Sequence, residues 1–85
     1  MIAGADQMPR YFFHIRDGWD RVPDEEGMEF LTLNLAEVEG YASANDLAAA
    51  ALLEGRRITA CAIEITDEGG TVLSRIKVEA LHCVA

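Results

Sequence analysis

The chain has 85 residues, which is the size of one small domain. Fifteen acidic residues against seven basic ones leave a net charge of −8, which disfavours generic binding to nucleic acid or to anionic membranes. No apolar run reaches the length of about 18 residues that indicates a membrane span. Residues 1–7 lack the basic start of a secretion signal, so we expect a cytoplasmic protein with no membrane partner.

Residues 1–7 show no periodicity and are expected to form a flexible leader before a single domain of residues 8–85, with Met8 as an alternative translation start. Residues 10–16 then alternate as a β-strand does. The two faces of this strand carry Tyr11, Phe13 and Ile15 on one side and Phe12, His14 and Arg16 on the other. Asp17-Gly18 predicts a tight turn into a short partner strand over 19–22, and Pro23 places that strand at a sheet edge.

Residues 24–31 predict an acidic turn followed by an apolar linker, and a helix is expected over 35–54. Asn34 offers an oxygen to the first free amides of this helix, and Glu37 stands three residues later to complete a capping box. Gly55 is the expected C-cap, because glycine readily adopts the left-handed conformation that ends a helix.

Apolar residues recur within this helix at a spacing of three to four, as expected for an amphipathic helix. They form one broad stripe that we expect to cover the core, namely Leu35, Val38, Ala42, Ala49, Leu52 and Leu53. Leu47 points away from this stripe, which hints at a second contact surface. Gly40 weakens the helix, and the sequence offers no reason for its presence.

A second hairpin follows, with strands over 60–66 and 71–78 joined by a turn at 67–70. Alternation predicts that one face carries Cys61, Ile63, Ile65, Val72, Ile76 and Val78, while Leu73, Arg75 and Lys77 face outward. The predicted fold is therefore α+β, in the order β-β-α-β-β, with one helix packed on a mainly antiparallel four-stranded sheet. The pattern leaves the strand order open.

Two motifs carry a family resemblance. Residues 9–14 read Pro-Arg-Tyr-Phe-Phe-His, with Arg-Asp-Gly at 16–18, and residues 23–27 read Pro-Asp-Glu-Glu-Gly. Together they resemble a family of small alphaproteobacterial proteins catalogued as a domain of unknown function. Its members also carry a strand similar to Ala-Ile-Glu-Ile-Thr-Asp at 62–67, and the similarity runs from Met8 to about Val78. The resemblance implies no catalytic or binding role for any residue.

The sequence predicts no metal site. The carboxylates around the first hairpin are Asp17, Asp20, Asp24, Glu25 and Glu26, and they do not match a calcium loop, so a solvated acidic turn is favoured. The candidate zinc ligands are His14, Cys61, His82 and Cys83, and they lack the close paired spacing of zinc sites. The two cysteines favour reduced thiols packed as small apolar groups, with a disulfide as the alternative.

No nucleophile stands in a recognisable pattern with a base, and no Gly-rich phosphate loop is present, so we expect neither an enzyme nor a bound cofactor. The sheet face away from the helix is the candidate interaction surface, formed by Phe12, His14, Arg16, Leu73, Arg75 and Lys77. We expect a homodimer or an accessory to another protein, because a small domain gains stability by burying apolar surface. The alternative is single-stranded nucleic acid on this face, which the acidic total charge disfavours.

Overall fold

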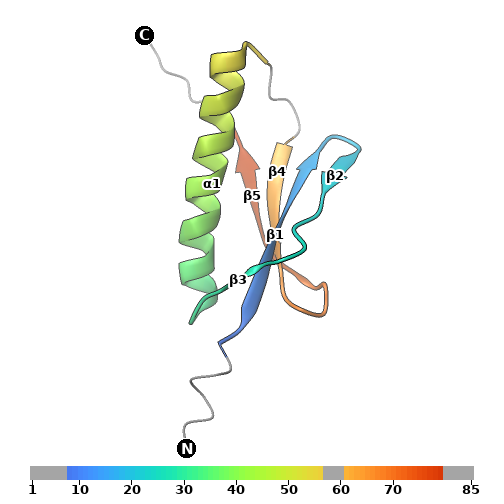
Figure 1. Ribbon diagram of the computed structural model, residues 1–85, viewed down its shortest axis with the longest axis vertical. Coiled ribbons are helices and arrows are strands. Elements are labelled where there is room, and N and C mark those ends of the chain that lie inside the picture. The colour runs from blue at the N-terminus through green and yellow to red at the C-terminus, as the bar shows by residue number, and fades with distance from the viewer. Residues whose placement is uncertain (1–7, 57–60, 80–85) are drawn as a thin grey trace, which may run out of the picture.

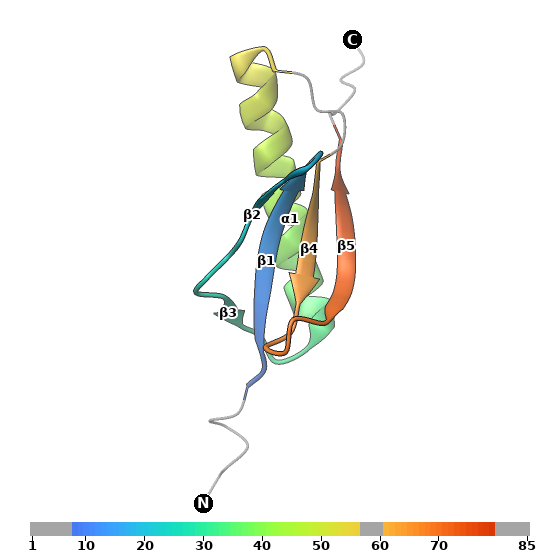
Figure 2. The ribbon, with the colours of Figure 1, turned by 90° about the vertical axis from the view of Figure 1, so that its right-hand side faces the viewer.

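The computed structural model describes residues 8–56 and 61–79, which form one helix and five strands. The elements follow the order β1 (Arg10–Asp17), β2 (Asp20–Val22), β3 (Met28–Glu29), α1 (Leu33–Glu54), β4 (Cys61–Thr66) and β5 (Val72–Val78). The strands form an antiparallel sheet in the order β2-β1-β4-β5, and β3 pairs with the start of β1. Figure 1 shows α1 lying along one face of this sheet, and Figure 2 shows β2 and β3 beside the same edge of β1. The predicted α+β class is confirmed, and β3 is a fifth strand where a linker was predicted.

The alternation of β1 and β4 divides their side chains as the sequence predicted. Tyr11, Ile63 and Ile65 are buried in the core under α1, and Phe13 packs against them. The turn after Asp17 contains Gly18 at a φ of 65°, a backbone conformation that glycine adopts without strain. The predicted leader (1–7) and the chain end beyond Glu79 lie outside the described residues.

The two ends of α1 differ in how well the sequence located them. The N-cap is Thr32, whose side-chain oxygen accepts a hydrogen bond from the backbone N–H of Leu35 over 3.2 Å. The predicted capping box of Asn34 and Glu37 is therefore wrong, since Glu37 instead accepts from the Ser74 hydroxyl over 2.8 Å. The C-cap is Gly55, as predicted, at a φ of 73°.

The face of α1 that meets the sheet is not the face that the apolar stripe indicated. The buried residues are small and follow one another every three or four positions, namely Ala36, Gly40, Ala44, Ala48 and Ala51. The large members of the predicted stripe are exposed, with Val38 at 66% and Leu53 at 88%. Leu47, predicted to face away from the core, packs against it. Small side chains let the helix axis approach the sheet closely, which explains the choice of face.

Gly40 marks the closest approach between the helix and the sheet. A Cβ built on Gly40 would lie 2.5 Å from Cδ1 of Ile76 and 3.2 Å from Cδ1 of Ile65. Both distances are shorter than an ordinary carbon–carbon contact of about 3.5–4.0 Å. Gly40 therefore has the packing role that the sequence did not reveal.

One inward residue of β5 was predicted wrongly. Ile76 and Val78 are buried as expected, but Val72 is exposed. A shift in register at Ile65/Thr66 pairs Ile65 with Ser74 and Thr66 with Val72. This irregularity takes up one extra residue in β5, so the simple alternation fails at the start of the strand.

Candidate functional site

The sheet face opposite α1 carries most of the side chains that the sequence selected, and we call it the outer face. Residues that are Cα partners across an antiparallel sheet share a face. Within residues 8–56 and 61–79, the outer face therefore contains four rows of partners, which are Arg21–Arg16–Ala62–Lys77, His14–Glu64–Arg75, Phe12–Thr66–Val72 and Arg10–Glu29. Among the described residues, no second layer of secondary structure covers this face (Figure 2).

A buried carboxylate lies at the centre of the outer face. The side chain of Glu64 is only 7% exposed, and its Oε2 accepts from Arg75 over 2.6 Å and from Arg16 over 3.3 Å. The hydrogen bond from Arg75 lowers the pKa of Glu64 more than burial raises it, and the charge of Arg16 lowers it further. Glu64 is therefore ionised at neutral pH and holds two guanidinium groups from different strands in place.

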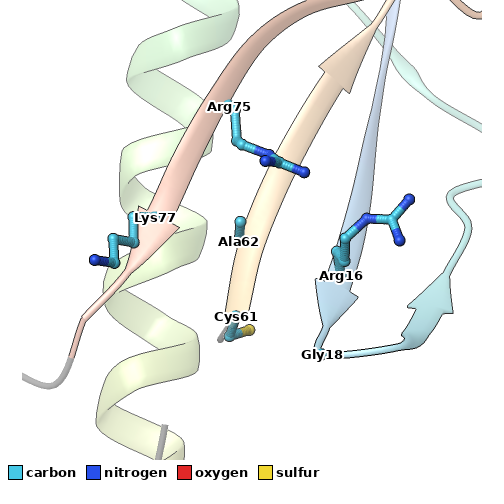
Figure 3. Close-up of a pocket in the computed structure, with 6 residues that line it drawn as sticks. All are labelled: Arg16, Gly18, Cys61, Ala62, Arg75 and Lys77. Carbon is cyan, nitrogen blue, oxygen red and sulfur yellow. The ribbon is translucent and has the colours of Figure 1, made fainter. Parts of the chain in front are cut away.

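A hollow of about 380 Å³ opens beside this ion pair. We call it the basic hollow, and its lining residues are Arg16, Gly18, Cys61, Ala62, Arg75 and Lys77. Figure 3 shows Arg75 reaching from β5 across β4 toward Arg16, with Ala62 between them, while Lys77 projects to the other side. The small side chain of Ala62 and the missing side chain of Gly18 leave this space open.

The segment between β2 and β3 lies against β1 through Asp24. Its carboxylate Oδ2 accepts from the backbone N–H of Phe13 over 3.1 Å, and its Oδ1 accepts from the backbone N–H groups of Glu26 and Gly27 over 3.2 and 3.1 Å. Burial opposes the ionisation of Asp24, but these three donors together lower its pKa. Phe13 lies on β1 between the residues that pair with β3 and those that pair with β2. At this point of the edge, the Asp24 carboxylate accepts the backbone hydrogen bond that a neighbouring strand would otherwise accept.

The same segment holds His14 in one orientation. The backbone N–H of Asp24 donates to Nδ1 of His14 over 3.0 Å, and Nε2 lies 3.1 Å from the Thr66 hydroxyl. Because Nδ1 accepts, the neutral ring carries its proton on Nε2 and donates to Thr66. Burial and the nearby charge of Arg21 lower the pKa of His14. The ring is therefore neutral at physiological pH.

Phe12 is occupied by contacts within the chain. Its ring stacks on His14 with centroids 6.3 Å apart and planes 7° apart. A Cβ built on Gly27 would lie 2.8 Å from the Phe12 ring, so the acidic turn packs closely against it. Arg10 also holds this turn, donating to the Glu26 carbonyl over 2.8 Å. Phe12 therefore does not stand free as a stacking platform.

Of the six residues of the predicted surface, Arg16, Arg75 and Lys77 line the basic hollow, whereas Phe12 and His14 belong to the network around Asp24. Leu73 is exposed at the irregular start of β5. Sequence reasoning missed Arg21 and the role of Asp24. The observed turn is Gly18-Trp19, because Asp17 pairs with Asp20, and this register places Arg21 opposite Arg16. An aspartate followed by a glycine three residues later is typical of a side-chain-capped turn.

A second feature lies on the opposite side of the molecule. The apolar stripe of α1 faces away from the sheet, with Leu35, Val38, Leu52 and Leu53 all exposed. Tyr41, on the same helix, is also exposed. An apolar stripe at helical spacing usually faces a core. We call this surface the helix stripe, consisting of Leu35, Val38, Ala42, Ala49, Leu52 and Leu53.

Cys61 lies at the edge of the basic hollow, and burial raises the pKa of its thiol. The structure does not describe His82 or Cys83, so the predicted alternatives for the two cysteines stay open. In residues 8–56 and 61–79, no three His, Cys, Asp or Glu side chains converge on a point where a metal ion could bind. Within the same residues, the helix is too short or too polar to cross a membrane.

Comparison with known proteins places the chain in a family. A family model described as "Domain of unknown function (DUF6894)" matches residues 10–79. The match begins with β1 and ends one residue after β5, so it includes both hairpins and α1. Neither the curated proteins nor the solved structures contain a match. Because the matched segment spans most of the chain, this protein belongs to the DUF6894 family, a family of domains of unknown function.

Proposed function

We propose that this domain is a non-enzymatic protein-interaction module that self-associates by packing the helix stripes of two copies against each other. The observation that carries the proposal is the exposure of large aliphatic side chains along α1, with Leu53 at 88%. Burying such side chains contributes about 25 cal/mol per Å² of apolar area. One copy of the chain covers only the alanine face of α1, so a second copy supplies the cover for the other face.

The distribution of side-chain size along the stripe suits a symmetric pair. Leu35 and Leu53 lie near its two ends, and at 1.5 Å per residue they are about 27 Å apart. In an antiparallel pair about a twofold axis, Leu35 of one copy lies beside Leu53 of its partner. Ala42 and Ala49 lie between them, where small side chains allow the two helices to approach.

The outer face is a weaker candidate for self-association, although the sequence favoured it. Two outer faces in contact would bring together the cationic side chains Arg16, Arg21, Arg75 and Lys77 of both copies. Like charges in an interface oppose association. Phe12, the aromatic residue expected to anchor such an interface, already packs on His14.

Single-stranded nucleic acid on the outer face is the second proposal, and the cations Arg16, Arg21, Arg75 and Lys77 on this face support it. Modules that bind single strands combine such cations with aromatic rings on which bases stack. Phe12 is the aromatic residue of this face among the described rows, and its ring is already stacked on His14. Self-association through α1 therefore has the stronger support. A cytoplasmic location and an alphaproteobacterial source stay predictions of the sequence.

The test is the molar mass in solution, measured by light scattering. We expect twice the chain mass of 9.3 kDa for the wild type and a monomer for the double variant Val38→Lys/Leu53→Lys, with unchanged circular dichroism. Trp19→Lys is the matched control, because Trp19 is 99% exposed and lies in the β1–β2 turn, so the dimer should persist. At a protein concentration of about 1 mM, even a dimer with an association free energy of only about 4 kcal/mol is detectable. A wild-type protein that is monomeric at this concentration overturns the proposal.

A further inference from the structure

We propose that the basic hollow binds a dianionic phosphoryl group, held between Arg16 and Arg75 above Ala62. This site lies on the face opposite the helix stripe, and it is independent of self-association. The proposal rests on charge, on the fixed position of the two guanidinium groups and on the size of the hollow.

The charge of the outer face is opposite to that of the chain. Among the described residues, four cationic side chains, Arg16, Arg21, Arg75 and Lys77, lie in the two rows that contain Glu64 or adjoin it, in a chain whose net charge is −8. At the other end of β1, Arg10 is paired with Glu29. Arg16 and Arg21 are direct cross-strand partners, and like charges in that arrangement destabilise a sheet. A dianion bound beside them relieves this repulsion.

The ion pair with Glu64 orients the two arginines without using all their donors. Arg16 donates from Nε and Arg75 donates from Nη2. Within residues 8–56 and 61–79, the other donors, which are both terminal nitrogens of Arg16 and Nη1 of Arg75, remain for a ligand. The two side chains are 39% and 59% exposed, so these nitrogens are accessible. A guanidinium held in place offers a planar pair of donors that matches a phosphoryl group.

The hollow is large enough for a phosphoryl group, and a third cation, Lys77, lies beside it. Its volume of about 380 Å³ is within the usual range for small-molecule sites. Ala62 is the direct cross-strand partner of both Arg16 and Lys77, so Lys77 stands on the next strand beside the bound group. Figure 3 shows the Lys77 side chain pointing outward, and a rotamer change of this exposed side chain brings its ammonium over Ala62.

The same features favour a phosphate monoester or free phosphate over a nucleic acid strand. A phosphoryl monoester carries about −1.5 to −2 charges at neutral pH. The three cations that line the hollow, Arg16, Arg75 and Lys77, exceed the single charge of Glu64 by two, which matches this ligand charge. Each phosphodiester of a strand carries a single charge, and strand binding relies on stacking. No aromatic side chain of the described residues lines the basic hollow.

The test is a titration followed through backbone amide resonances at low ionic strength. The probes are phenyl phosphate, inorganic phosphate and a short oligothymidine, with sodium chloride as the ionic-strength control. We expect phenyl phosphate or inorganic phosphate to shift the amide resonances of Gly18, Ala62 and Lys77. Tighter binding of phenyl phosphate indicates that the natural ligand is a phosphate ester, and tighter binding of inorganic phosphate indicates free phosphate.

Two variants test the site without removing a partner of Glu64. Lys77→Gln should weaken phosphate binding about fivefold, the loss expected for one exposed charge pair, and Ala62→Leu should block it by filling the hollow. Arg56→Gln is the matched control, because it removes one exposed positive charge that pairs with Glu54 outside the hollow. All three variants should keep the wild-type molar mass. A failure of the phosphate proposal is therefore distinguishable from a failure of the proposed self-association through the helix stripe.

Three results overturn the proposal. The first is that neither phosphate probe shifts these amides beyond the chloride control. The second is that Lys77→Gln and Arg56→Gln bind phosphate equally. The third is that oligothymidine binds more tightly than phenyl phosphate, which would assign the face to nucleic acid.

Discussion

The backbone N–H of Asp24 donates to Nδ1 of His14 over 3.0 Å, and this bond joins the two sequence motifs of the chain. His14 belongs to the first motif, and Asp24 begins the acidic turn of the second. Asp24 also accepts from the backbone of Phe13, and His14 reaches Thr66 on β4. The acidic turn is thus a structural element that closes the free edge of β1.

Asp24→Asn should lower the free energy of unfolding by about 1–3 kcal/mol. The amide side chain has one oxygen for the three backbone donors that the two carboxylate oxygens now satisfy, and it carries no charge. Urea denaturation at pH 7 measures the change. Glu25→Gln is the control, because Glu25 is exposed in the same turn and should unfold like the wild type. Equal stability of the two variants would contradict the role given to Asp24.

Stability should fall as the pH decreases below about 6.5, the usual pKa of histidine. The folded protein lowers the pKa of His14, so the unfolded chain binds the proton more readily. The contribution of His14 is therefore complete above pH 6.5 and is lost as the pH falls through the folded pKa. Asp24 and Glu64, whose pKa values are also lowered, add further losses in the range below their usual values of 3.8 and 4.5.

Urea denaturation at several pH values between 5 and 7.5 measures the first of these losses. The dependence of the unfolding free energy on pH in this range should vanish in His14→Phe, because phenylalanine does not titrate. This variant should be less stable than the wild type at every pH. The pH dependence should persist in His82→Gln, which removes the other histidine of the chain. The opposite pattern would assign the pH dependence to His82.

Gly40→Ala should destabilise the protein by about 1 kcal/mol although alanine is the better helix former. The added Cβ overlaps Cδ1 of Ile76, and overpacking costs about 1–3 kcal/mol, which exceeds the gain of about 1 kcal/mol in helix propensity. Ile76→Val removes the overlapping atom. In that background Gly40→Ala should become neutral or stabilising, so the two substitutions form a double-mutant cycle. Additive effects would show that the contact does not limit the packing.

The thermal midpoint should rise with protein concentration if two helix stripes pack together. Mass action stabilises the folded dimer, and a tenfold increase in concentration should raise the midpoint by about 3–5 °C. Scanning calorimetry over a hundredfold range of concentration measures this. The midpoint of Val38→Lys/Leu53→Lys should not depend on concentration. A wild-type midpoint that is equally constant would argue against self-association.

Local sequence signals predicted the elements of this fold well. The alternation in residues 10–16 placed Tyr11 and Phe13 on the core side, and Gly55 marked the end of the helix. These signals succeed because they depend on backbone conformation and on neighbours within a few residues. The cationic side chains Arg16, Arg75 and Lys77 were placed on one face for the same reason.

Tertiary structure alone decided which side of α1 is buried and what the acidic turn does. The helix is apolar on two sides, so periodicity selected the side with the larger residues, Val38 and Leu53, and the structure buries the side with Gly40 and Ala44. Steric fit against Ile76 decides between the two sides, because only small side chains allow the helix to lie this close to the sheet. Such a fit joins residues far apart in the chain, and no local pattern records it.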